Sequence, residues 1–149
     1  MRSFQVIFIS INILLSCHSP DNKGVKKDTS DILRLEMKLS AFGVESDEVP
    51  NIDAYIDFKK DSSHCNKSYY NPKYADTVYC LTKPEIQHLL NLLEGVDLRT
   101  LKRQYTDSSS DLPTSTTIIY LATDTIAVVD YGLIGDRPLP DLYKIVYKK

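Results

Sequence analysis

The sequence contains no tryptophan, so its ten tyrosines are the main large side chains that combine an apolar ring with a polar group. Tyrosine-rich surfaces bind partners, but half-buried strands also favour tyrosine. We interpret most of the tyrosines as strand residues.

The chain also has almost no net charge, since 18 basic residues oppose 20 acidic ones. Binding to nucleic acid needs a basic surface that neutralises phosphates, so no nucleic-acid partner is expected. The sequence has no nucleophilic serine elbow, no Gly-rich phosphate loop and no paired-carboxylate motif. We therefore expect no cofactor, no metal and no enzymatic activity.

After Cys17, no apolar stretch approaches the roughly 20 residues that span a membrane. The start of the chain is different, because Arg2 precedes an apolar run over residues 4–15 and the small residue Ser16 follows it. This is the pattern of an export signal. The segment Leu14-Leu15-Ser16-Cys17 resembles the lipobox of bacterial lipoproteins. That resemblance implies that Cys17 is lipidated and becomes the mature N-terminus; plain secretion and a retained anchor are the alternatives.

The predicted organisation follows from this start. Residues 1–16 form the lipoprotein signal peptide, residues 17–30 a flexible polar tether, and residues 31–149 a single domain. The expected location is the bacterial cell envelope, with the protein anchored to the membrane by lipid and facing the periplasm or the exterior.

With Cys17 assigned to lipidation, two cysteines are left, Cys65 and Cys80. Disulfides persist in exported proteins. A bridge between these two residues would close a loop of about fifteen residues and stabilise the fold by roughly 3 kcal/mol. We favour this disulfide; two free, buried thiols are the alternative.

The first half of the domain is predicted to be mainly extended. Apolar and charged residues alternate over residues 32–40 and again over 52–58, which indicates two half-buried strands. Residues 59–67 are expected to form a loop, and a third extended stretch follows around residues 74–81. Thr82, Pro84 and Glu85 then fit a capping box at the start of a helix, which Gly95 is expected to end in a left-handed C-cap.

The second half begins with a short helix capped by Asp97, which carries Leu98, Leu101 and Tyr105. Residues 107–113 are expected to form a loop by composition. Two stretches rich in β-branched residues, 116–121 and 125–131, predict a β-hairpin. A final helix is expected over residues 139–146. The fold class is therefore α+β, with a mostly antiparallel sheet and helices packed on one face.

From Thr82 onward, the order of these landmarks is similar to that of an uncharacterised domain family of bacterial lipoproteins. The matching pieces are the capped helix, Leu101 with Tyr105, the loop that ends in residues 111–114 and the hairpin that ends in residues 129–132. Such domains often carry a Cys-Phe-Gly-x-Cys-Pro stretch between their first two strands. Residues 41–45 contain no cysteine, so no role of that pair transfers to this chain. The resemblance implies a fold and no activity.

Few side chains form a pattern that would carry chemistry. His64 and Cys65 are adjacent on an extended segment, so they point to opposite faces and do not pair easily as base and nucleophile. With Cys80 and His88 they lack the close ligand pairs of a structural zinc site. Asp130 and Tyr131 end the hairpin and are candidate binding residues; alternatively, Asp130 satisfies turn amides.

The sequence thus predicts a membrane-anchored envelope lipoprotein with a non-enzymatic binding or structural role. Its expected contact surface is the sheet face that the helices leave uncovered, and its expected partners are the membrane and an envelope protein. An inhibitor or immunity-type lipoprotein that acts on an envelope enzyme is one alternative. An envelope hydrolase or thiol enzyme is another.

Overall fold

The structure, a computed structural model, describes residues 31–42, 44 and 47–148. The predicted signal peptide, Cys17 and the predicted tether lie outside the described residues. Within that part of the chain, no helix is both long enough and apolar enough to cross a membrane.

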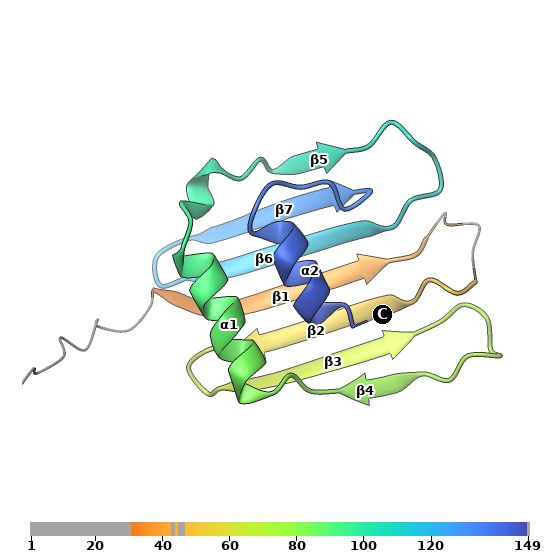
Figure 1. The fold of residues 1–149 in the computed structure, drawn as a ribbon, viewed down its shortest axis with the longest axis horizontal. Coiled ribbons are helices and arrows are strands. Elements are labelled where there is room, and N and C mark those ends of the chain that lie inside the picture. Colours follow the sequence, from red (N-terminus) through yellow and green to blue (C-terminus); the bar gives the residue numbers. More distant parts are fainter. Residues whose placement is uncertain (1–30, 43, 45–46, 149) are drawn as a thin grey trace, which may run out of the picture.

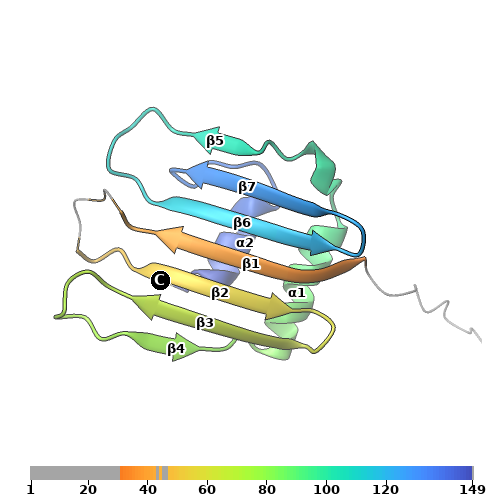
Figure 2. The same ribbon diagram turned by 180° about the vertical axis from the view of Figure 1, so that it is seen from behind.

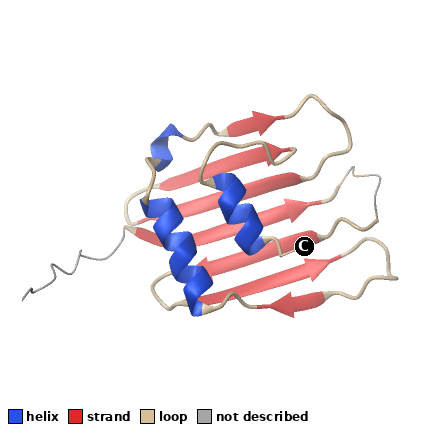
Figure 3. Ribbon diagram, viewed as in Figure 1, coloured by secondary structure: helices blue, strands red, loops and turns tan. Residues whose placement is uncertain are grey.

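The fold is a seven-stranded sheet with two α-helices (Figures 1 and 3). The strand order is β4-β3-β2-β1-β6-β7-β5; every pair is antiparallel except β5 with β7. A short 3₁₀ helix, η1, precedes β5. The elements are β1 (Ile32–Ser40), β2 (Asn51–Asp57), β3 (Ser62–Ser68), β4 (Thr77–Tyr79), α1 (Lys83–Glu94), η1 (Leu98–Thr100), β5 (Gln104–Thr106), β6 (Thr114–Leu121), β7 (Thr125–Tyr131) and α2 (Leu139–Val146).

The central strand β1 separates the two faces of the sheet. Leu35, Met37 and Leu39 are at most 2% exposed, whereas the residues between them are charged. The register continues this division into the neighbouring strands, because Leu35 lies opposite Ile56 of β2 and Ile119 of β6. The sheet therefore has one apolar face, which forms the core, and one polar face.

The two helices lie on the same side of the sheet in the ribbon diagrams. Both are in front of the strands in Figure 1 and behind them in Figure 2. Their buried residues belong to the same core cluster as the apolar strand residues; they are Ile86, Leu89 and Leu93 of α1 and Leu139, Leu142, Tyr143 and Val146 of α2. The opposite, polar side of the sheet is called the open face below. It carries Arg34, Glu36, Lys38, Asp53, Tyr55, His64, Asn66, Thr116, Ile118 and Tyr120.

The capping box of α1 is confirmed. The Thr82 hydroxyl accepts a hydrogen bond from the Glu85 amide, and the Glu85 carboxylate accepts one from the Thr82 amide at 2.7 Å. The same carboxylate forms an ion pair with Lys148 beyond α2, at 2.7 Å. These contacts, the Lys148 one foremost, lower the pKa of Glu85 from 4.5 to about 2. Glu85 thus joins the start of α1 to the C-terminal segment.

The structure also confirms the strand over 32–40, the strand near 52–58, the hairpin and the final helix. Three expectations are wrong. Most of the stretch 59–67 belongs to strand β3, Tyr105 lies in strand β5 rather than on a helix, and Gly95 ends α1 in a right-handed conformation with φ −76°. The Gly95 amide donates to the Asn91 carbonyl at 3.0 Å, so the helical hydrogen bonding simply continues to this residue.

We expect Glu85→Gln to lower the free energy of unfolding at pH 7 by about 1 kcal/mol, because the amide can keep the capping hydrogen bond but loses the ion pair with Lys148 and the negative charge at the helix N-terminus. The pKa of Glu85 is lowered in the folded state, so its carboxylate stabilises the fold above about pH 4.5, and this stabilisation is lost as the pH falls towards 2. Urea unfolding at pH 7 and at pH 2.5 measures both effects. Glu94→Gln, on the exposed last turn of α1, is the control and should change stability by less than about 0.5 kcal/mol. A Glu85→Gln loss of equal size at both pH values would contradict the assignment.

Candidate functional site

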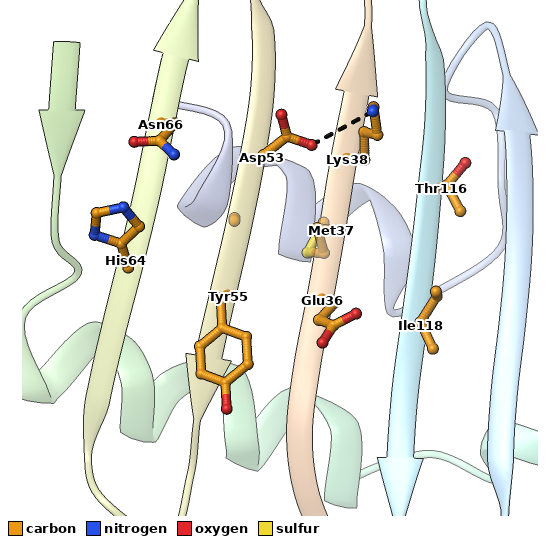
Figure 4. A pocket seen from close by; sticks show the side chains of 10 residues that line it. Glu36, Met37, Lys38, Asp53, Tyr55, His64, Asn66, Thr116 and Ile118 are labelled. Atoms are coloured by element: carbon orange, nitrogen blue, oxygen red, sulfur yellow. Dashed lines mark ion pairs between the residues drawn. The ribbon is translucent and has the colours of Figure 1, made fainter.

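A hollow of about 380 Å³ lies on the open face, across four neighbouring strands (Figure 4). It is formed mainly by the strand residues whose side chains point away from the helices. Two of its lining residues, Met37 and Ala54, are buried core residues that lie between the polar positions. The remaining lining residues are Glu36 and Lys38 of β1, Asp53 and Tyr55 of β2, His64 and Asn66 of β3, and Thr116 and Ile118 of β6.

Charges in and beside this hollow are balanced by cross-strand and same-strand pairs. The Lys38 ammonium lies 3.7 Å from the Asp53 carboxylate (Figure 4), and both side chains are well exposed. Arg34 Nε lies 3.1 Å from the Glu36 carboxylate. An exposed pair such as Lys38–Asp53 contributes little to stability, whereas the Arg34 and Glu36 side chains are each only 34% exposed. The main effect of the two pairs is that the open face presents both signs of charge without a strong net field.

Beside the hollow, an arginine lies between two tyrosines, of which Tyr55 also lines the hollow. The Arg34 guanidinium carbon lies 3.7 Å from the centre of the Tyr120 ring and 5.4 Å from that of Tyr55. The Tyr120 hydroxyl donates to the Glu36 carboxylate at 3.0 Å. Hydrogen bonds with Tyr120 and Tyr55 raise the pKa of Arg34. These cation–π contacts link residues of three strands, and Tyr55, with 40% of its surface exposed, offers an aromatic contact point beside them.

The two histidines of the described residues, His64 and His88, do not converge. His64 is exposed on the open face, where it lies opposite Tyr55 in the β2–β3 register. His88 is exposed on α1, which lies on the other side of the sheet (Figures 1 and 2). Within the described part of the chain, no group of three or more His, Cys, Asp or Glu side chains is placed to hold a metal ion.

The structure contradicts the predicted disulfide, because Cys65 and Cys80 are both free thiols. Cys65 lies opposite Tyr79 in the β3–β4 register, so Cys80, one residue further along an extended chain, points to the other side. Cys65 is accordingly fully buried and Cys80 exposed. Burial raises the pKa of the Cys65 thiol to about 11, which keeps it protonated and unreactive at neutral pH.

Asp130 and Tyr131 lie away from the hollow. Asp130 is fully buried, and its carboxylate accepts hydrogen bonds from the Ile134 amide at 3.0 Å, the Gly135 amide at 2.8 Å and the Tyr143 hydroxyl at 2.7 Å. A Cβ at Gly135 would come within 2.7 Å of that carboxylate, so glycine permits the close approach. The Tyr131 hydroxyl accepts from the Leu112 amide at 3.3 Å. Asp130 therefore accepts hydrogen bonds from the backbone amides of the turn, which argues against its predicted binding role.

Apart from His64, sequence reasoning did not single out the residues that line the hollow. The sequence did mark several of them, because Glu36, Lys38 and Asp53 occupy the polar positions of the alternating stretches. Those positions become one surface only when the strand register is known, and the register was not predicted. Asn66 was missed for a second reason, because its strand was expected to be a loop, and His64 was considered only as a base or a zinc ligand.

Comparison with protein-family models, curated proteins and solved structures finds no match to this chain. The resemblance to the uncharacterised lipoprotein family therefore stays a prediction.

The two thiols should differ sharply in reactivity. In the folded protein at pH 8, we expect iodoacetamide to modify Cys80 quickly and Cys65 at least a hundredfold more slowly, because the Cys65 thiol is buried and its pKa is about 11. Mass spectrometry of peptides from the unreduced protein measures both rates. In urea the two rates should become similar, which is the control. Detection of a disulfide-linked peptide that contains Cys65 and Cys80 would contradict the free thiols and support the predicted disulfide.

Proposed function

We propose that this protein is a non-enzymatic binding protein of the bacterial cell envelope, held at the membrane by lipid on Cys17. In this proposal the domain is of the α+β class with its helices packed on one face, and the partner docks on the open face. The single observation that carries the binding role is the hollow over β1, β2, β3 and β6. Binding sites are usually hollows that combine apolar and aromatic surface with polar side chains that orient the ligand, and this lining has both.

The character of the open face supports a partner with little net charge. Lys38 is paired with Asp53 and Arg34 with Glu36, so the surface would repel neither sign strongly and attract neither. Tyr55 and Ile118 supply apolar contact, while His64 and Asn66 supply hydrogen-bonding groups. An envelope protein segment with mixed polar and apolar side chains fits this surface.

The arrangement of reactive groups also supports binding over catalysis. His64 has no cysteine or second histidine beside it on the open face, and its sequence neighbour Cys65 points into the core. A nucleophile needs an adjacent base or a lowered pKa, and burial raises the pKa of Cys65 instead. A thiol-enzyme role has no supporting geometry among the described residues.

Site-specific photo-crosslinking in cells tests the docking face. A crosslinking residue placed at Asn66 should capture a discrete envelope partner, whereas one at Gln87, exposed on α1, should not. Tyr55→Ala should lower capture from Asn66 about tenfold, because truncating a central aromatic anchor typically costs more than 1 kcal/mol. Tyr70→Ala is the matched control, since Tyr70 is 62% exposed but lies outside the hollow. Equal capture from Asn66 and Gln87, or no effect of Tyr55→Ala, would count against the proposal.

The lipid anchor has its own test. Mass spectrometry of the mature N-terminus should find acylated Cys17, and the protein should sediment with membranes. Cys17→Ala should abolish acylation, because the acceptor thiol is gone, whereas Cys80→Ala should leave both acylation and membrane fractionation unchanged. A wild-type protein that fractionates as soluble would reject the anchor and leave the docking face to be judged by the crosslinking result alone.

A further inference from the structure

A second hollow, of about 410 Å³, lies at one end of the sheet between η1 and the start of β7. Leu98, Leu101 and Ile126 form its apolar part. Arg99 and Arg103 also line it, and both side chains belong to exposed residues. It is separate from the hollow of the open face and shares no lining residue with it.

Within the part of the chain that the structure describes, neither arginine of this hollow forms an ion pair. Among the described residues, the ion pairs engage Arg34 and Arg137 but neither Arg99 nor Arg103. Asp124 also lines the hollow, and its carboxylate accepts a hydrogen bond from the Thr125 amide at 2.7 Å within the β6–β7 turn. Two guanidinium groups beside an apolar floor suit a ligand that carries a phosphate next to hydrocarbon.

The place of this hollow relates it to the N-terminal segment. Asp31, the first described residue, accepts a hydrogen bond through its carbonyl from the Ala122 amide at 2.8 Å. Ala122 belongs to the same β6–β7 turn that contributes Asp124 to the hollow. Figures 1 and 2 agree that the start of β1, this turn and η1 lie at one end of the sheet. The chain therefore enters the fold beside the two arginines.

We propose that the hollow of Arg99 and Arg103 binds the phosphate headgroups of anionic phospholipids in the membrane that holds the anchor. This inference rests on the proposed lipidation of Cys17. Residues 18–30, if extended, reach at most about 45 Å, and as a flexible coil they span about 20 Å on average. Such a link lets the entry end of the domain reach the bilayer surface. The attraction between basic side chains and anionic lipids acts within a Debye length of about 8 Å, a distance that the entry end can reach on this link.

The test measures the chemical accessibility of individual arginines in the lipidated, full mature protein. The protein is reconstituted in vesicles of phosphatidylcholine alone or of phosphatidylcholine with about one third phosphatidylglycerol, treated with phenylglyoxal, and analysed by peptide mass spectrometry. In the anionic vesicles, modification of Arg99 and Arg103 should slow by about fivefold or more, the factor expected per basic residue near an anionic surface. Arg137, whose side chain is 87% exposed, is the internal control and should react equally in both vesicles.

A matched pair of variants identifies the groups responsible. Arg103→Gln should reduce the protection of Arg99 about fivefold, whereas Arg137→Gln should leave it unchanged. Equal reactivity of Arg99 in the two vesicle types would overturn the headgroup proposal, and so would protection of Arg137 to the same degree. Failure of the wild-type protein to associate with either vesicle would instead reject the anchor, so the two proposals fail in different ways.

Discussion

The two-residue alternation of β1 is the constraint on which the structure depends. Leu35, Met37 and Leu39 must face the core, and a slip of one residue would move Arg34 and Glu36 into it. The cost of burying these charged side chains fixes the register of β1 with β2 and β6. Because of this register, the neighbouring strands also have one apolar face and one polar face. Both the core under the helices and the hollow of the open face are thus consequences of one strand pattern.

The two proposed sites use different physical chemistry because they lie on different parts of the sheet. On the open face, cations are stacked on tyrosine rings or paired with carboxylates, which leaves a surface suited to shape and hydrogen bonding. At the end where the chain enters, Arg99 and Arg103 have no such partners, which leaves their charge available. In the proposed arrangement the strands point away from the membrane, so the open face is turned sideways and accessible to a partner.

Local sequence signals predicted the elements that local interactions specify. The residues of Ile32–Ser40 predict a strand by their alternation, and those that follow Thr82 predict the start of a helix by their capping box. Strand β3, Ser62–Ser68, has few strand-forming residues and exists because β2 and β4 pair with its two edges, a tertiary effect that no window of sequence contains. The open-face hollow depends on that register as well. Asp130 was recognised as a special residue, but only the fold reveals that its partners are backbone amides and Tyr143.

The entry of the chain through a central strand has a mechanical consequence. Because β1 is paired antiparallel with β2 on one side and β6 on the other, a pull applied through the residues before Ile32 loads two ladders of hydrogen bonds at once. When the force runs along the strand, these bonds must break together in shear rather than one after another from an edge. Forced unfolding is limited by the rate of such a step. A domain held by its N-terminal segment in this way resists being pulled open from that end.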